Sequence, residues 1–275
     1  MAAPLPGIDG RSRPSVLLFT SRTATPCRIA VVASAPPSPV AGGLGAVYAW
    51  GAGAAFFTSL AFFVYTYAVA WAPPLGQAGA GPRAGAVVYN TLLFGLFALH
   101  HSVFARTGAK RWLTRHVRPA FERATFVWVA SVLLALVCAA WRPVGGSLYH
   151  HGGAVRWAHF AIVALGVVLT AAGARRLRPL ELAGIEQARH RPGRREELVL
   201  AWPYNLVRHP IYLGWVLFVF GVPHMTMDRF LLAVLSTTYL VAAVPLEERQ
   251  LERVFGDAYR YYRARVRWRI VPGVY

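Results

Sequence analysis

The sequence has few cysteines and little charge for its length. Its two cysteines, Cys27 and Cys138, lie far apart, so no disulfide framework can be argued and redox chemistry is not indicated. Charged residues make up only 15% of the 275 residues, whereas hydrophobic residues make up 56% and the mean hydropathy is +0.42. This composition excludes an ordinary soluble domain and favours a chain embedded in lipid.

The sequence also lacks the motifs of common nucleotide-binding folds. No Gly-x-Gly-x-x-Gly follows a predicted strand and no Walker pattern occurs, so neither a soluble dinucleotide-binding domain nor an NTPase is supported. Lysine is nearly absent, and arginine carries almost all of the net charge of +18. These arginines lie between apolar segments, where they orient a membrane protein and contact membrane lipids. A nucleic-acid partner is therefore disfavoured.

What the sequence does contain is a series of apolar segments. About 20 residues are needed to cross the hydrocarbon core of a bilayer, and the first four segments are long enough. The last two are shorter and predict a helical hairpin whose arms are short for a full crossing, the first of them being bounded by Pro210 and Pro223. The six segments are 46–71, 86–105, 124–141, 156–174, 211–223 and 230–245.

These segments predict an all-α fold, a polytopic transmembrane bundle of about five to six helices in one domain over residues 46–275. Residues 1–45 are rich in Pro, Ala, Ser and Arg and predict a disordered tail. Leu246–Val266 has an apolar face among arginines and predicts an amphipathic helix at the membrane interface.

The basic residues are distributed unevenly between the loops. They crowd the loop after the second segment, the loop after the fourth, and the C-terminal tail, whereas residues 72–85 and 142–155 are nearly uncharged. Because basic residues beside spans stay on the cytoplasmic side, we expect an inner-membrane protein with both termini in the cytoplasm. The basic residues of the first of these loops are Arg106, Lys110, Arg111, Arg115, Arg118 and Arg123.

A run of polar residues opens the fifth segment. Pro210 suits the first turn of a helix, which places Arg208 and His209 beside free N–H groups that favour an anion. Glu247 and Glu248 stand at the cytoplasmic end of the sixth segment, just after Pro245, and the hairpin returns them to the same membrane face as Arg208. This pattern predicts a site for a ligand with a carboxylate and a cationic group. Alternatively, an Arg–Glu salt-bridge cluster locks the hairpin to the tail helix.

These residues also carry a family resemblance. The runs RHPIYLG from Arg208, LEER from Leu246 and FGDAYRYYR from Phe255 resemble the C-terminal signature of the isoprenylcysteine carboxyl methyltransferase superfamily. Upstream, the runs LHHSVFAR from Leu99, ERAT from Glu122 and WRP at residues 141–143 are similar to its NnrU-like and methanethiol S-methyltransferase branch. The resemblance implies an S-adenosylmethionine pocket within residues 203–265.

The resemblance further implies a membrane methyltransferase that acts on a small thiol, of the methanethiol kind, or on a lipid-borne acceptor. Two alternatives remain open, a non-catalytic NnrU-like accessory protein and an isoprenylcysteine-type carboxyl methyltransferase. Arg208, Glu247 and His101 are the implied catalytic residues. The implied cofactor-binding residues are Tyr204, Arg208, His209, Tyr212, Gly214, Glu247 and Glu248.

Two other readings of the sequence are weaker. His100 and His101 invite a metal site, but neighbours on a helix point about 100° apart and cannot chelate one ion together, so we predict no metal. His101, with Ser102, is expected inside the bundle, either as packing or as a substrate-side group. Sterol reductases share an Arg-His-Pro element, but Trp215 follows the glycine where they commonly have an acidic residue, which disfavours a nicotinamide cofactor.

Overall fold

The structure is a computed structural model of the 275-residue chain. It describes residues 16–17, 28–32, 43–74, 79, 81–104, 106–177, 183, 185 and 195–275.

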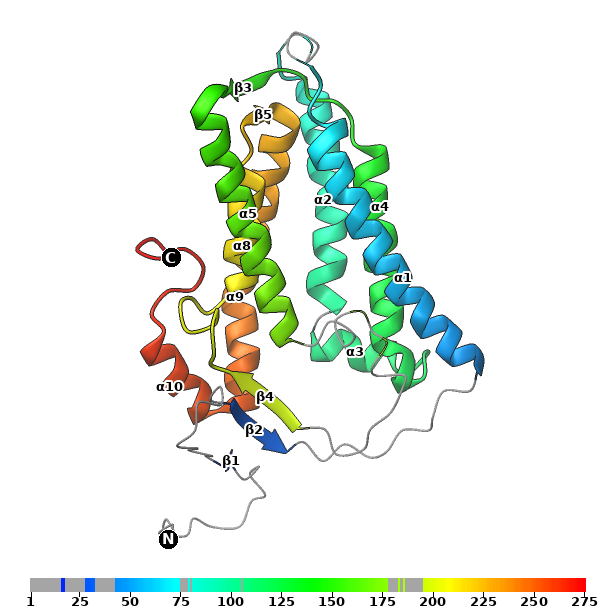
Figure 1. Ribbon diagram of the computed structural model, residues 1–275. Coiled ribbons are helices and arrows are strands. Elements are labelled where there is room, and N and C mark those ends of the chain that lie inside the picture. The colour runs from blue at the N-terminus through cyan, green and yellow to red at the C-terminus, as the bar shows by residue number, and fades with distance from the viewer. Residues whose placement is uncertain are drawn as a thin grey trace.

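The fold is a bundle of long helices arranged in two groups (Figure 1). One group holds α1 (Gly43–Tyr65, continued by a π-helical turn over Thr66–Ala70), α2 (Ala84–Phe104) and α4 (Glu122–Ala140). The other holds α5 (Gly153–Arg176), α8 (Pro210–Phe220) and α9 (Met227–Phe255). Two short helices, α3 (Thr107–Leu113) and α10 (Asp257–Arg265), lie at the end of the bundle where α2 and α9 finish.

Five helical stretches of the described chain are long and apolar enough to cross a membrane, whereas α8 is shorter. The prediction of a polytopic helical bundle is therefore confirmed. Their outward surfaces carry many exposed large apolar side chains, such as Leu92, Leu99 and Val168, as expected for helices that face lipid. The five stretches are Gly43–Ala70, Ala84–Phe104, Pro119–Ala140, Gly153–Arg176 and Met227–Phe255.

One part of the sequence-based prediction is wrong. The sixth apolar segment, predicted as short, belongs to a 29-residue helix that runs through Pro245. At 1.5 Å per residue this helix is about 43 Å long, enough to cross the bilayer. A proline is tolerated inside such a helix because neighbouring groups can satisfy the carbonyl that it leaves unpaired. Only α8 is the short arm of the hairpin.

The predicted amphipathic helix over Leu246–Val266 is not continuous. Its first half is the end of α9, and the chain breaks at Gly256, whose φ of 55° lies in the left-handed region that glycine adopts without strain. The second half is α10, which packs its buried Tyr259 and Tyr262 against Phe255 and Leu198. This part of the chain therefore folds back on the bundle instead of continuing along one line.

At the opposite end, buried polar contacts join the two groups of helices. Asp228 at the start of α9 accepts hydrogen bonds through Oδ1 from Trp141 Nε1 (2.7 Å) and from the backbone N–H of Val144 (2.9 Å). Arg229 donates to the backbone oxygens of Tyr67 and Ala68 at the end of α1. The short strands β3 (Ser147–His150) and β5 (His224–Thr226) pair antiparallel beside these contacts.

A second sheet lies near α10 (Figure 1). Its strands β1 (Val16–Leu17), β2 (Arg28–Val32) and β4 (Arg195–Val199) are antiparallel in the order β1-β2-β4. Two short stretches of residues 1–45 are thus paired strands, and Gly43 begins α1. The rest of the tail that we predict to be disordered lies outside the described residues.

Helices α5 and α8 approach each other closely through glycines. A Cβ placed on Gly214 would lie 2.6 Å from the backbone oxygen of Gly166 and 2.8 Å from the backbone nitrogen of Thr170. Helices in lipid commonly pack through small residues in this way, because backbone-to-backbone contact replaces the hydrophobic drive that lipid cannot supply.

This packing generates a prediction for Gly214→Ala. The added methyl group would have to displace backbone atoms, so we expect a loss of about 1–3 kcal/mol in the free energy of unfolding, measured on the protein in detergent micelles. Gly95→Ala on α2 is the matched control, because a Cβ there meets nothing within 4 Å, and we expect a change within about 0.5 kcal/mol. Equal effects of the two substitutions would contradict the proposed role of the α5–α8 contact.

Candidate functional site

The turn that leads into α8 is held by the C-terminal segment. The backbone N–H groups of Arg208 and His209 donate to the carbonyl oxygens of Trp268 (2.9 Å) and Arg269 (2.8 Å). Pro210 then begins α8, as the sequence predicts, because it has no N–H group that the first helical turn would leave unpaired. Residues about 60 positions apart in the chain therefore fix where Arg208 and His209 point.

Glu248 is the centre of a buried ionic cluster. Its Oε1 lies 2.7 Å from Arg208 Nε, and the two side chains are only 4% and 7% exposed. Arg269 Nε donates to Oε2 at 3.3 Å, and His209 Nε2 lies 3.5 Å from Oε1. The salt-bridge alternative therefore describes Glu248, which joins α9 to the turn before α8 and to the C-terminal segment.

Arg208 also caps the C-terminal end of α10. Its Nη1 donates to the backbone oxygens of Val266 (3.2 Å) and Arg263 (3.4 Å). A cation is favoured there, because the last carbonyl groups of a helix are unpaired and carry partial negative charge. The other terminal nitrogen, Nη2, has no hydrogen-bond partner in the described part of the chain, which leaves one side of the guanidinium for a ligand.

Glu247 is oriented differently from its neighbour. Consecutive residues on a helix point about 100° apart, so Glu247 faces away from the buried cluster, and its side chain is 44% exposed. Its Oε2 accepts a hydrogen bond of 2.7 Å from the Tyr212 hydroxyl and lies 3.7 Å from His209 Nδ1. The rings of His209 and Tyr212 stack with their centroids 5.2 Å apart. These three side chains form one wall of an opening.

That opening is a pocket of about 140 Å³ between α8, α9 and α10. Five of the residues predicted from the sequence line it together: Tyr204, Arg208, His209, Tyr212 and Glu247. The remaining lining is apolar or aromatic and consists of Leu177, Leu198, Val199, Pro210, Ile211, Leu251, Phe255, Tyr259 and Tyr262.

The tyrosines Tyr259 and Tyr262 are functional candidates that the sequence did not identify. The apolar spacing of 246–266 assigned them to a membrane-facing surface, whereas both are buried and line the pocket. Burial raises the pKa of both hydroxyls, and also that of Tyr204, so all three are neutral donors. The Tyr259 hydroxyl has no hydrogen-bond partner among the described residues, whereas Tyr262 donates to the Tyr204 carbonyl at 2.7 Å.

Three predicted site residues are not in the pocket. Glu248 lies behind it in the ionic cluster, and Gly214 faces α5, where it allows close helix packing. His101 lies on α2, where its ring contacts those of Phe126 and Tyr239 with centroids 5.3 Å and 6.3 Å apart.

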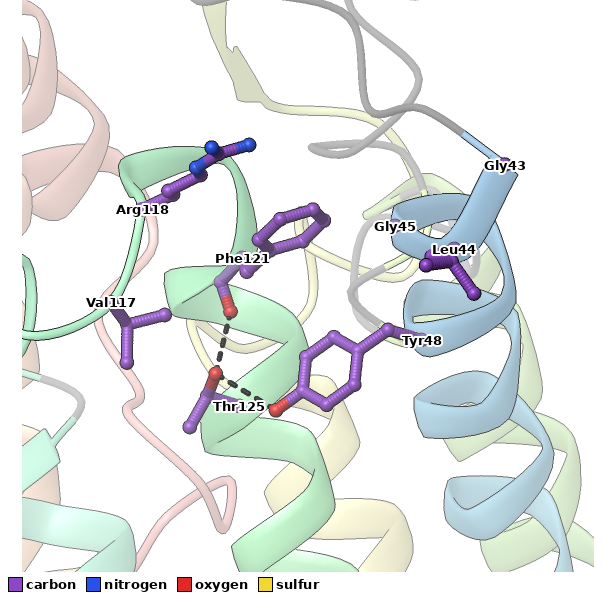
Figure 2. A pocket seen from close by; sticks show the side chains of 8 residues that line it. All are labelled: Gly43, Leu44, Gly45, Tyr48, Val117, Arg118, Phe121 and Thr125. Carbon is purple, nitrogen blue, oxygen red and sulfur yellow. Dashed lines mark hydrogen bonds between the residues drawn. The ribbon is translucent and has the colours of Figure 1, made fainter.

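A second depression, of about 580 Å³, lies where α1 begins beside α4 (Figure 2). Tyr48 and Thr125 share a hydrogen bond of 3.0 Å there, and Thr125 Oγ1 also donates to the Phe121 carbonyl. Its lining is mainly apolar, with Arg118 as its charged side chain, and it contains none of the predicted site residues. The pocket at Arg208 combines a cation, a carboxylate and hydroxyl groups, so it is the better candidate for binding a polar ligand.

The chemistry of the Arg208 pocket suits a zwitterionic ligand. The free side of a guanidinium binds a carboxylate, and the exposed Glu247 carboxylate binds an ammonium group or hydroxyls. Pockets for drug-sized ligands usually enclose about 300–1,000 Å³, so a nucleoside-sized ligand would need to extend beyond the 140 Å³ pocket through its open side.

Comparison with known proteins places the same region in a known family. Residues 154–258 match the family model described as phospholipid methyltransferase, a range that covers α5, α8 and α9. A methanethiol S-methyltransferase of Mycobacterium tuberculosis is 39% identical over 196 residues, which are 68% of this chain and 79% of that protein. Methanethiol S-methyltransferase 2 of Bradyrhizobium diazoefficiens is 33% identical over 221 residues, or 78% and 84% of the two chains.

A more distant relative is Nurim of Sus scrofa, which is 29% identical over 184 residues, covering 62% of this chain and 67% of that protein. No solved structure matches the chain.

The two adjacent glutamates should respond differently to loss of charge. Glu248→Gln would leave Arg208 buried without its counter-ion, so we expect a loss of about 3 kcal/mol in the free energy of unfolding. Glu247→Gln is the matched control: its side chain is 44% exposed, and we expect a loss below about 1 kcal/mol. Denaturant unfolding in detergent micelles measures both, and an equal loss in the two variants would contradict the separate roles.

Proposed function

We propose, on the premise that the chain belongs to the isoprenylcysteine carboxyl methyltransferase-like superfamily of membrane methyltransferases, that it uses S-adenosylmethionine to methylate a small thiol. The family predicted from the sequence is confirmed, and the chain is a multi-pass membrane methyltransferase. Its relatives at 33–39% identity are named as methyltransferases, which disfavours the non-catalytic alternative.

The observation that carries the proposal for the methyl donor is the pairing of Arg208 and Glu247 across one pocket. S-Adenosylmethionine has a carboxylate, an ammonium group and ribose hydroxyls, and it supplies an electrophilic methyl group when bound. Arg208 would hold the carboxylate through Nη2, while Glu247 would accept hydrogen bonds from the ammonium group or the hydroxyls. The Tyr212 hydroxyl orients the Glu247 carboxylate for this role.

The aromatic lining supports the same assignment. Tyr204, Tyr259 and Tyr262 surround the pocket with neutral rings, and aromatic faces attract a cation such as a sulfonium. The unpartnered Tyr259 hydroxyl provides a further donor for a polar group of the ligand. In this arrangement the protein contributes binding, orientation and exclusion of water, which supply much of the rate of a direct displacement. No nucleophilic side chain is needed.

A thiol of the methanethiol kind is the acceptor that the relatives favour, since six of them carry that substrate in their names. A small thiol partitions into the apolar interior of the bundle without a headgroup site. A lipid-borne acceptor is the alternative, and an acceptor screen with purified protein separates the two.

We place the protein in the inner membrane with both termini in the cytoplasm. The loop after α2 is strongly basic, and so is the region from α10 to the C-terminus, whereas the segments at the opposite end of the bundle carry few charges. Basic flanks are retained on the cytoplasmic side. The Arg208 pocket then faces the cytoplasm, where S-adenosylmethionine is made.

This orientation predicts the behaviour of two reporter fusions. A fluorescent protein fused after Tyr275 should fluoresce, whereas alkaline phosphatase at the same position should be inactive because it stays in the cytoplasm. Alkaline phosphatase inserted between β3 and α5, after Gly152, should be active. The opposite pattern would contradict the orientation.

The donor assignment predicts how the purified protein binds S-adenosylmethionine in calorimetry. Wild type should bind saturably, and Glu247→Gln should bind about tenfold more weakly, because a charge-assisted contact contributes roughly 1.4 kcal/mol. Glu252→Gln is the matched control, since Glu252 lies on the same helix but pairs with Arg260 and Arg263 outside the pocket. We expect its affinity to be unchanged.

Arg208→Lys extends this test. Lysine keeps the charge beside Glu248, but its one ammonium group cannot contact Glu248, the end of α10 and a ligand carboxylate together as three guanidinium nitrogens can, so binding should weaken while the protein stays folded. Failure of folded wild-type protein to bind S-adenosylmethionine would refute the proposed donor.

A further inference from the structure

The structure contains a second polar cluster, at the contact between α2 and α9, where the two groups of helices meet (Figure 1). His101 projects from α2 among the rings of Phe97, Phe126 and Tyr239, with centroids 5.7, 5.3 and 6.3 Å away. Its Nδ1 atom is buried and has no hydrogen-bond partner among the described residues. A buried imidazole nitrogen without a hydrogen bond costs free energy, and a ligand that donates a hydrogen bond to it would remove that cost.

Tyr239 connects this cluster to the candidate site. Its hydroxyl lies 3.5 Å from Ser102 Oγ on α2. Tyr239 also lies on α9 eight residues, or about two helical turns, before Glu247, which lines the Arg208 pocket. Tyr239 therefore contacts His101 from the same helix that carries Glu247, and the rings of Phe94 and Phe97 pack beside it.

The proposed reaction needs a proton acceptor, and the His101 imidazole is such a group. A neutral alkanethiol is a poor nucleophile, because the thiolate is the reactive form. When the thiol sulfur forms its bond to the methyl carbon, the bond from that carbon to the sulfonium sulfur breaks, and the S–H proton must leave. In surroundings as apolar as those of His101, a side chain with a basic nitrogen is a better proton acceptor than water.

We propose that the acceptor thiol binds in the contact between α2 and α9 and that His101 accepts its proton through Nδ1. This inference rests on the proposed function and assigns the acceptor side of the same site. A neutral thiol, a sulfonium cation and a neutral imidazole become two neutral thioethers and an imidazolium, so atoms and charge balance. Tyr239 and Ser102, whose hydroxyls lie 3.5 Å apart, position the thiol beside His101.

Other charged groups surround the proposed base. Arg123 on α4 and His100 on α2 act electrostatically on His101, and Arg106 acts on Tyr239. His100 itself stacks against Phe104 and Phe126, with centroids 5.0 and 5.4 Å away, on a different face of α2. His100 is thus a neighbour of the same type that lacks the contact with Tyr239.

The test compares two acceptors of nearly equal size that differ in acidity, methanethiol and methaneselenol. Methaneselenol is ionised at neutral pH and needs no proton acceptor, whereas methanethiol does. His101→Asn keeps a polar group near Nδ1 but cannot take a proton. We expect it to lower kcat/KM for methanethiol about 100-fold, within the range for general-base catalysis, and to lower kcat/KM for methaneselenol less than about fivefold.

The matched control is His100→Asn, which should change kcat/KM for the two acceptors by the same factor. Binding of S-adenosylmethionine by both variants, measured by calorimetry, should equal that of wild type. An equal loss for both acceptors in His101→Asn would overturn the assignment of His101 as proton acceptor and leave the proposed function standing. If wild-type protein binds S-adenosylmethionine but methylates neither acceptor, the proposed thiol methylation fails and this inference fails with it.

Discussion

The ion pair between Arg208 and Glu248 is the contact on which the site depends. Glu248 belongs to α9 and Arg208 to the turn before α8, and the guanidinium also holds the carbonyl end of α10 through Val266. One side chain thus fixes three elements relative to each other. The pair is nearly excluded from water, so removing one partner leaves an uncompensated charge, and this is why the three elements are coupled.

The adjacent carboxylates of Glu247 and Glu248 have different surroundings in this arrangement. Glu248 neutralises Arg208 and Arg269 inside the protein, while Glu247, one residue earlier, opens toward the pocket. The helical rotation of about 100° per residue produces this separation. A buried structural charge and an accessible carboxylate, to which we assign ligand binding, therefore lie side by side, and two cations around one buried carboxylate leave the local charge balance favourable to an anionic group.

Packing elsewhere in the bundle fixes this site at one end of the bundle. The polar contacts of Asp228 and Arg229 join both helix groups at the far end, and the Gly166–Gly214 approach fixes α8 against α5. Since α8 is much shorter than α9, its first turn lies beside Glu247, about two helical turns before α9 ends at Phe255. The pocket there combines polar side chains with an apolar lining and is open on one side, which suits the proposed transfer of a methyl group from a soluble donor to an apolar acceptor.

The sequence by itself determined the membrane class, four of the spans and the start of α8 at Pro210, because hydropathy and proline act locally, and its family resemblance pointed to five residues that line the pocket. Only the tertiary structure decided the rest. It extended α9 through Pro245, broke the tail helix at Gly256, turned Gly214 toward α5 and brought Tyr259 into the pocket. These outcomes depend on which surfaces meet in three dimensions, and the spacing of residues along one helix does not specify whether its apolar face meets lipid or protein.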